Sequence, residues 1–318
     1  MQRREFLIKT AKAAALAAAA TGTGAFFHNR ITREAEPVVI KQLSFEVPFD
    51  RDFPQVALAR NEDTLRALAS ALDSIGGIGR FIHPGERVTI KPNVGWDRTP
   101  EQAANTNPVL VGEMVRLCLE AGASRVIVTD VTCNDPRRCF LRSGINDAAS
   151  TAGASVILPE EADFVQADLD GRLLTVWPVL KHFIETDRFI NMPIVKQHSL
   201  TGCTIGMKNL YGILGGRRNR LHQQIDQSIV DLADYCSPTL TVVDASRVLQ
   251  RSGPQGGSLD DVTIHHSVLC ATDQVAADSR AVEFLGLTGA EIDHILLAEK
   301  AGLGRVDYLN AGYQEIAS

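Results

Sequence analysis

The sequence predicts an α/β fold in which helices cover both faces of a mostly parallel sheet. Short β-branched runs alternate with amphipathic helical patterns, and short turns connect them. The 318 residues are 45% hydrophobic and 22% charged, which allows a sizeable core and argues against a disordered chain. This length suits one large domain or two lobes with a cleft, and a lobe boundary is expected at about residues 160–190.

Helix caps and apolar spacing define the elements expected in the first half. Asn61 and Asn107 are typical helix caps, Pro108 is typical of a first helical position, and Gly76-Gly77-Ile78-Gly79 ends a helix. In order, the expected elements are an edge strand with a loop over 31–60, a helix from Asn61, a strand over 86–90, a helix from Asn107, a strand over 124–128, a helix over 139–152 and a strand over 155–158.

The second half repeats the alternation with longer loops. The expected elements are a strand over 188–192, a Gly-rich irregular segment over 198–219, a helix from about His222, a strand over 240–243, a loop over 251–259, a strand over 268–271 and a helix over 275–285. Ligands of open α/β sheets bind beyond the carboxyl ends of strands. The polar residues that follow strands are therefore candidates for a site: Lys91, Asn93, Asp130, His198, Asp244 and Asp273.

The first 30 residues indicate a targeting segment ahead of the body over 31–318. Arg3-Arg4 is followed by Phe6-Leu7, by Lys9 and by an alanine-rich run, which resembles a twin-arginine translocation signal. The resemblance implies the twin-arginine translocase as a partner and a periplasmic or otherwise exported location. No clear cleavage site follows, so an uncleaved membrane anchor stays open, and the alternative is an amphipathic cytoplasmic helix.

Charge excludes one class of partner and marks one region. The net charge is −6, and the first 30 residues carry five basic residues against one acidic, so the rest carries −10, which argues against a nucleic-acid partner. Within this acidic body, basic residues gather at Lys208, Arg217, Arg218 and Arg220. Glycines lie among them at Gly202, Gly206, Gly212, Gly215 and Gly216. This composition predicts a site for a phosphate or carboxylate, with glycine N–H groups free to bind it, and the alternative is a flexible surface loop.

Two histidines border the same segment. His198 and His222 can be metal ligands, acid/base groups or hydrogen-bonding residues. Asp244 and Asp278 can bind a hard cation or act as caps, and Asp273 is expected to be a cap. Lys91 can contact a ligand or pair with Asp130.

The six cysteines do not form a disulfide framework, and no Cys-x-x-Cys pair indicates an iron–sulfur module. Cys133 and Cys139 lie in a polar loop and can form a local disulfide in the periplasm or stay free. Cys118, Cys236 and Cys270 are expected in the core, and Cys203 is a candidate soft-metal ligand. No nucleophile elbow or Walker-type loop is present.

An ordered set of motifs resembles one known family. The motifs are Ile90-Lys91-Pro92-Asn93, Gly122-Ala123, Lys196-Gln197-His198, Met207-Lys208-Asn209-Leu210-Tyr211-Gly212, His222, Val243-Asp244, Ser252-Gly253-Pro254 and Asp273–Asp278. Together they are similar to the domain of unknown function 362 family over about residues 55–290. The chain departs from that pattern at Gln274, where the family usually has proline, and lacks the ferredoxin-like cysteine module of many relatives.

The order His198, Lys208, His222 is also similar to that of nickel-pincer lactate racemases. This likeness implies that Lys208 anchors an organometallic cofactor, that His222 ligates nickel or another divalent metal, and that His198 is an acid/base. The sequence therefore predicts a metal- or cofactor-dependent enzyme acting on a small carboxylate, with Asn209 among the ligand contacts. A non-catalytic periplasmic binding protein and an assembly factor for an exported complex are the alternatives.

Overall fold

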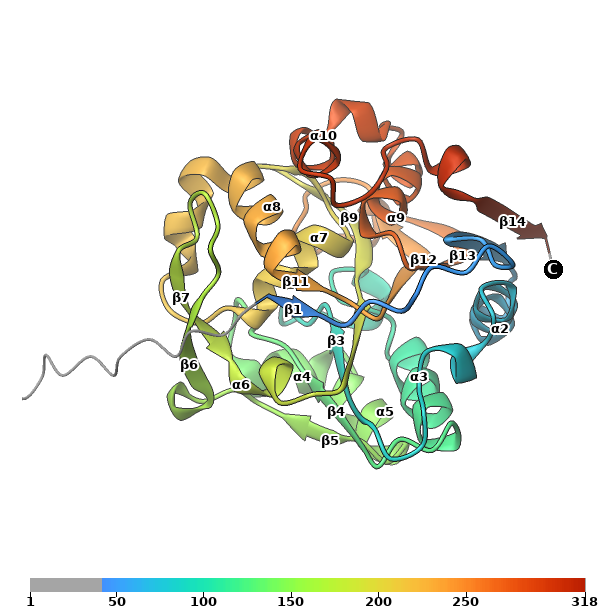
Figure 1. Cartoon of the computed structure of the whole chain (residues 1–318), viewed down its shortest axis with the longest axis horizontal. Helices are drawn as coiled ribbons and strands as arrows, with labels where there is room; N and C mark the ends of the chain where they lie inside the picture. The colour runs from blue at the N-terminus through green and yellow to red at the C-terminus, as the bar shows by residue number, and fades with distance from the viewer. Residues whose placement is uncertain (1–41, 318) are drawn as a thin grey trace, which may run out of the picture. The chain divides into compact units, whose positions relative to one another are not determined.

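The computed structural model describes residues 42–317, which lie within one compact unit (Figure 1). The predicted targeting segment lies outside the described residues. Within residues 42–317, no helix is long and apolar enough to cross a membrane. The main sheet has the order β14 (Tyr313–Ala317), β2 (Val56–Arg60), β13 (Val262–Ala271), β12 (Leu240–Leu249), β8 (Arg188–Met192), β3 (Arg87–Pro92), β4 (Arg125–Thr129), β5 (Ser155–Ile157).

The central part of this sheet is parallel, as the sequence predicts. It consists of β12 (Leu240–Leu249), β8 (Arg188–Met192), β3 (Arg87–Pro92), β4 (Arg125–Thr129) and β5 (Ser155–Ile157). Beyond β12 the sheet becomes antiparallel, because β13 (Val262–Ala271) pairs antiparallel with both β12 and β2 (Val56–Arg60). The last strand, β14 (Tyr313–Ala317), pairs parallel with β2, so β2 is internal and not the expected edge strand.

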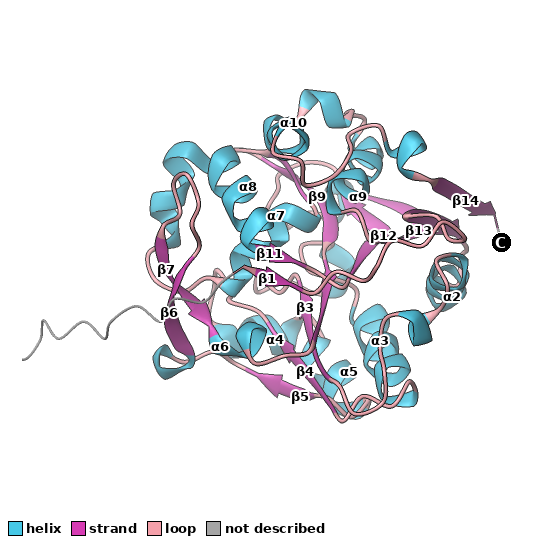
Figure 2. Ribbon diagram, viewed as in Figure 1, coloured by secondary structure: helices cyan, strands magenta, loops and turns pink. Residues whose placement is uncertain are grey.

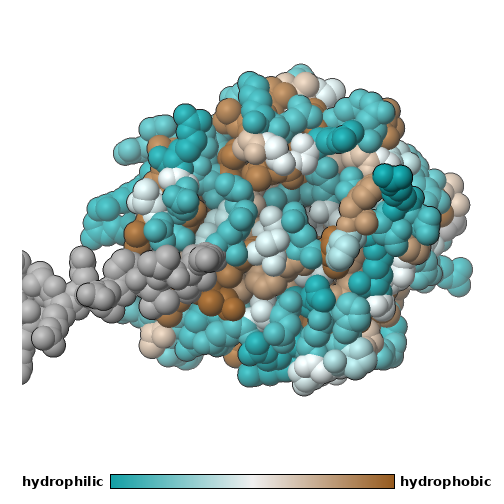
Figure 3. Space-filling model, in the orientation of Figure 1, coloured by the Kyte–Doolittle hydropathy of each residue, from teal (hydrophilic) through white to brown (hydrophobic). Residues whose placement is uncertain are grey.

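Helices cover both faces of the sheet, and each face has its own core (Figure 2). The alternation of β2 shows this directly, because Leu58 belongs to one core and Ala57 to the other. α2 (Thr64–Ser74), α3 (Pro108–Glu120) and α5 (Ile145–Thr151) line one core. α8 (Ile225–Tyr235), α9 (Gln274–Ala281) and α10 (Asp293–Lys300) line the other. The face in Figure 3 is mostly hydrophilic, with smaller hydrophobic groups between.

Two helix predictions were wrong in detail. The helix expected over 139–152 is divided into α4 (Pro136–Arg142) and α5, because Gly144 between them is left-handed with φ 73°. The cap of α2 is Asp63, whose carboxylate accepts a hydrogen bond from the main chain of Leu65. Asn61, the predicted cap, instead accepts one from the main chain of Asp63. Asn107 caps α3 as predicted.

The segment over 198–219 is more regular than expected. β9 (Ile194–His198) and β10 (Gly202–Thr204) form an antiparallel hairpin, and α7 (Gly206–Asn209) follows. Residues 160–190 contain a separate hairpin of β6 (Phe164–Asp168) and β7 (Val176–Leu180), followed by α6 (Lys181–Ile184). The short strands β1 (Leu43–Ser44) and β11 (Cys236–Ser237) pair with each other.

The sheet reverses its winding direction at β3. From β3 the chain continues to β4 and β5, which lie on one side of β3 in the sheet. The strand β8 pairs with β3 on its other side. Such a switch point leaves a crevice at the carboxyl ends of the strands. Asn93 and Asp130 directly follow β3 and β4, so the fold brings them to this edge.

Candidate functional site

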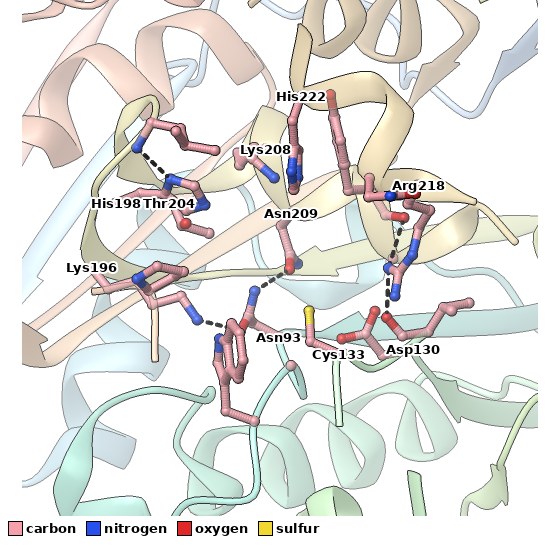
Figure 4. A pocket seen from close by; sticks show the side chains of 18 of the residues that line it. Asn93, Asp130, Cys133, Lys196, His198, Thr204, Lys208, Asn209, Arg218 and His222 are labelled. Carbon is pink, nitrogen blue, oxygen red and sulfur yellow. Dashed lines mark hydrogen bonds between the residues drawn. The ribbon is translucent and has the colours of Figure 1, made fainter. Parts of the chain in front are cut away.

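A cavity of about 450 Å³ lies at this edge of the sheet (Figure 4). The site residues predicted from the sequence that line it are Lys91, Asn93, Asp130, His198, Lys208, Asn209, Gly212, Gly216, Arg217, Arg218 and His222. The two histidines and the lysine proposed as the chemical centre therefore share one cavity. The cavity is also lined by five residues that were not among the predicted site residues: Trp96, Cys133, Lys196, Thr204 and Tyr211.

The remaining predicted residues do not line the cavity. The buried carboxylate of Asp244 accepts hydrogen bonds from the main chain of Asn107 at 2.8 Å and the hydroxyl of Ser246 at 2.6 Å. Asp273 caps α9 by accepting from the N–H groups of Val275 and Ala276, as expected. These carboxylates hold the fold together and do not face a common ligand.

Asp278 positions the segment that carries Lys208. Its carboxylate is fully buried and accepts from the N–H groups of Gly206 at 2.7 Å and Met207 at 3.0 Å. Burial raises the pKa of Asp278 to about 7, and these two hydrogen bonds oppose the shift. The side chain of Asp278 therefore accepts the hydrogen bonds of the first two N–H groups of α7.

The glycines serve close packing. A Cβ atom at Gly212 would lie 1.7 Å from Oδ1 of Asp130, and one at Gly215 would lie 2.6 Å from the ring of Phe164. The expected free N–H groups are not available at Gly206, which donates to Asp278, or at Gly215, which donates to the carbonyl of Pro178 at 2.8 Å. The number of glycines thus reflects steric limits around the cavity.

An ion pair forms one wall of the cavity. Nζ of Lys91 lies 2.7 Å from Oδ1 of Asp130 and donates to Oδ1 of Asn209 at 3.2 Å. Asn93 donates to the same Asn209 oxygen at 2.8 Å. Burial lowers the pKa of Lys91, and the charge of Asp130 opposes this shift. Lys91 therefore has its charge partner within the chain, which was one of the two open interpretations.

Lys196 lies beside this pair and has no carboxylate partner among the described residues. The residue is 1% exposed, and its ammonium donates to Oδ1 of Asn93 at 2.9 Å and to the carbonyl of Ala104 at 2.6 Å. Burial lowers the pKa of Lys196 to about 7. Its position could have been inferred, because residues two apart on a strand face the same side and Lys196 precedes His198 by two.

Lys208 has still fewer partners. It is nine-tenths buried and lines the cavity, and its Nζ donates no hydrogen bond to any residue within 42–317. The ammonium lies 3.8 Å from the centre of the Tyr211 ring, a cation–π contact that supplies part of the lost hydration. Burial lowers the pKa of Lys208 to about 8, so the amine and ammonium forms are both populated near neutral pH.

His198 is held in one tautomer by the main chain. Its Nδ1 accepts a hydrogen bond from the N–H of Leu200 at 3.1 Å, so the proton of the neutral ring is on Nε2. Burial, with the positive charge of Lys208, lowers the pKa of His198 to about 3. His198 is therefore a neutral N–H donor, and an Nε2 that bears a proton cannot ligate a metal.

The remaining basic residues lie at the rim. Arg218 donates to the carbonyls of Val131 at 2.8 Å and Thr132 at 2.6 Å, which ties the loop after β4 to the segment after α7. Arg217 and His222 are exposed. Partial burial and the charge of Lys208 lower the pKa of His222.

The cavity suits an anion better than a bare metal ion. Its charged side chains are Lys91, Lys196, Lys208, Arg217 and Arg218 against the single carboxylate of Asp130. Within residues 42–317, no group of three or more His, Cys, Asp or Glu side chains could hold a metal. The predicted ligand set of His198, His222, Asp244 and Asp278 is not brought together, so the residues present do not fit a metal held by the protein alone.

The cysteines follow the sequence expectation in the core. Cys118, Cys236 and Cys270 are buried, as is Cys203, whose pKa burial raises well above its usual value. Cys133 and Cys139 are free thiols. Cys139 is buried, whereas Cys133 is exposed and lines the cavity.

Residues 88–283 match the model of a family described as a domain of unknown function, DUF362. This match covers more than half of the chain and most of the cavity lining. The chain belongs to the DUF362 family. It is also similar to the thylakoid-associated protein sll1697 of Synechocystis sp., with 24% identity over 247 residues that cover 75% of each protein.

Two solved structures show a distant similarity to this DUF362 protein. The lactate racemase apoprotein of Thermoanaerobacterium thermosaccharolyticum is 9% identical, with a TM-score of 0.45 over 77% of this chain and 61% of that one. A protein of Thermotoga maritima is 12% identical, with a TM-score of 0.40 over 71% of this chain and 59% of that one. The chain thus spans about six tenths of each of these two structures.

Proposed function

We propose that the cavity binds a small carboxylate and that the protein is an enzyme that moves a proton on this ligand. The observation that carries the proposal is Lys208, a nine-tenths buried residue that lines the cavity and whose ammonium has no hydrogen-bond acceptor among the described residues. A buried cation without a partner is costly, and a ligand carboxylate would supply the missing partner.

The surrounding groups favour the same ligand. Lys196 adds a second ammonium with no carboxylate partner among the described residues, and Nε2 of His198 supplies a neutral N–H donor. The main guanidinium donors of Arg218 are occupied by main-chain carbonyls, so a bidentate clamp on a phosphate is not supported. A carboxylate held by one ammonium and one N–H fits these donors.

Proton transfer is assigned to Lys196, because the ligand carboxylate holds Lys208 in its ammonium form. A cavity group whose pKa is about 7 is suited to act as an acid or a base near neutral pH. His198 keeps its proton on Nε2 because Nδ1 is occupied, so it is proposed as a donor that orients the ligand and not as the base. His222, exposed at the rim, is placed to meet ligand groups that extend out of the cavity.

Titration calorimetry with lactate, glycolate, pyruvate and succinate tests the binding step. We expect at least one to bind, and Lys208→Met to weaken that binding by about tenfold or more, since a charged partner is lost. Lys300→Met is the matched control, because Lys300 is exposed on α10. The proposal is rejected if none binds, if inorganic phosphate alone binds, or if Lys208→Met leaves the affinity unchanged.

Deuterium exchange separates the enzyme from a non-catalytic binding protein. Incubation of bound lactate, glycolate or succinate in D₂O is expected to exchange the hydrogen on the carbon beside the carboxylate, and Lys208→Met is expected to stop this exchange. Binding without exchange would favour the binding protein. Stable copurification of the native protein with a partner chain would favour the third candidate, an assembly factor.

A cofactor attached to Lys208 remains a prediction. The amine fits such an attachment, because its pKa of about 8 leaves an uncharged fraction and no described side chain occupies it. A bound cofactor would supply redox chemistry at the carbon beside the carboxylate. The intact mass of protein purified from its native host tests this, and an unmodified mass would reject it.

Export by the twin-arginine route is likewise proposed from the first 30 residues. Replacement of Arg3 and Arg4 by lysine is expected to leave the protein in the cytoplasmic fraction, whereas Arg30→Lys is expected to leave its location unchanged. Equal export of all three proteins would contradict the proposal.

A further inference from the structure

We propose that Cys133 is a reactive thiol of the cavity and forms a covalent bond with carboxylates that carry an electrophilic carbon. This inference rests on the proposed binding of a carboxylate at Lys208. Cys133 is exposed, is a free thiol and lines the same cavity as Lys208. Figure 4 shows its sulfur projecting into the cavity between Asn93 and Asp130.

The loop that carries Cys133 is fixed on both sides. The N–H of Cys133 donates to the carbonyl of Gly95 at 2.9 Å, and the hydroxyl of Thr132 donates to the carbonyl of Asn134 at 2.6 Å. Arg218 holds the carbonyl of Thr132 at 2.6 Å. The thiol is therefore presented to the cavity by an ordered loop and not by a free surface turn.

Basic side chains share the cavity with the sulfur. Lys91, Lys196 and Lys208 line the same cavity as Cys133, and burial lowers the pKa of each of these lysines. An anionic reagent that enters the cavity is therefore attracted toward the thiol. Asp130 is the one carboxylate that lines the cavity beside these lysines.

The second observation concerns the ligand. Lys208 is nine-tenths buried and lacks an acceptor among the described residues, so its ammonium marks where a carboxylate would lie. A carboxylate there places its neighbouring carbon in the same 450 Å³ cavity as the sulfur. With a 2-oxo acid, the thiol of Cys133 gives its proton to solvent, and the Sγ–carbon bond forms as the carbonyl π electrons move to oxygen. That oxygen takes a proton from Lys208, which regains one from solvent. The step needs no oxidant or further reactant.

Iodoacetate and iodoacetamide test the inference, because they differ only in the carboxylate. In both reactions the bond from Sγ to CH₂ forms as the carbon–iodine bond breaks and iodide leaves. Peptide mass spectrometry gives the alkylation rate at Cys133, and glutathione in the same solution gives the ratio of the two reagents for a simple thiol. We expect the ratio of iodoacetate to iodoacetamide rates at Cys133 to exceed that of glutathione on the order of tenfold.

Controls connect this preference to Lys208. Lys208→Met is expected to bring the ratio to that of glutathione, and Lys300→Met is expected to leave it high. On the unmodified protein, excess acetate is expected to slow iodoacetate more than iodoacetamide, a test that requires no variant. The buried Cys118, Cys236 and Cys270 are internal controls that should not be alkylated in the folded protein.

Two results would overturn the inference: an unmodified Cys133, or a ratio equal to that of glutathione on the unmodified protein. If calorimetry still shows Lys208-dependent carboxylate binding, only the role of the thiol fails. If that binding is absent as well, the proposed function fails with it.

Discussion

The main-chain N–H of Leu200 points at Nδ1 of His198 over 3.1 Å, and this contact decides what the histidine can do. A neutral imidazole has one N–H, so occupation of Nδ1 as an acceptor leaves the proton on Nε2. Protonation of Nδ1 would place its N–H against the N–H of Leu200. This repulsion disfavours the charged ring, as burial does, and so agrees with the lowered pKa of His198. His198 is thus prepared to donate to a ligand oxygen.

The tautomer of His198 is directly measurable. We expect nitrogen-15 NMR to show a protonated Nε2 and an unprotonated Nδ1, with no change between about pH 5 and 8, because the pKa lies at about 3. His83, which is exposed, serves as the reference histidine. A His198 signal that titrates near about 6.5 would contradict the assignment.

Carboxylate affinity should depend on pH through Lys208. Its pKa in the free protein is about 8, so the ammonium is lost above that value, and affinity should fall by roughly tenfold per pH unit there. Because the ligand stabilises the charged form, binding near about pH 8 should take up protons, which calorimetry in buffers of different ionisation heat detects. Affinity that stays constant up to about pH 10 would show that Lys208 does not hold the carboxylate.

Gly212 should tolerate no side chain. Its Cβ would lie 1.7 Å from Oδ1 of Asp130 and 2.5 Å from Nζ of Lys91, and neither group of this buried ion pair can move into solvent. We expect Gly212→Ala to lower the free energy of unfolding by about 1–3 kcal/mol or more in urea denaturation. Gly79→Ala is the matched control, because nothing lies within 4 Å of its added Cβ. Equal stabilities of the two variants would remove the steric explanation for the glycine.

Asp278 should affect the site through α7. Gly206 and Met207 donate to different oxygens of Asp278, so Asp278→Asn leaves one acceptor and turns an NH₂ group toward the other N–H donor. We therefore expect a loss of about 1–3 kcal/mol in unfolding free energy. We also expect weaker carboxylate binding in the variant, with the pKa of Lys208 altered, since α7 carries Lys208. Asp293→Asn, at an exposed position of α10, is the control. A destabilised variant with unchanged affinity and unchanged Lys208 pKa would limit Asp278 to the fold.

Local rules predicted the parallel sheet and the meeting of its strand ends. Lys91, Asn93 and Asp130 come together because parallel strands end at one edge, which alternation and short turns reveal in the sequence. Pairings between distant segments carry no such local signal. The parallel addition of β14 to β2 and the contact of Asp278 with α7 were therefore not predictable.

The chemistry of the site was less predictable than its location. The predicted metal ligands were two histidines and two aspartates. The sequence does not show that Asp244 and Asp278 accept hydrogen bonds from buried main-chain N–H groups. Nor does it show that the N–H of Leu200 donates to Nδ1 of His198. The sequence placed Cys133 in a polar loop, but it did not show that this loop borders the cavity. Orientation of side chains decided these roles.

The pKa of Lys208, measured with and without a carboxylate, tests the central claim most directly. In protein labelled with carbon-13 at lysine Cε, the Lys208 signal is assigned by its loss in Lys208→Met. We expect it to titrate at about 8 in the free protein and at a higher pH once the carboxylate found by calorimetry is saturating. A Lys208 pKa near about 10.4 that no carboxylate raises would contradict the claim that its buried ammonium binds an anionic ligand.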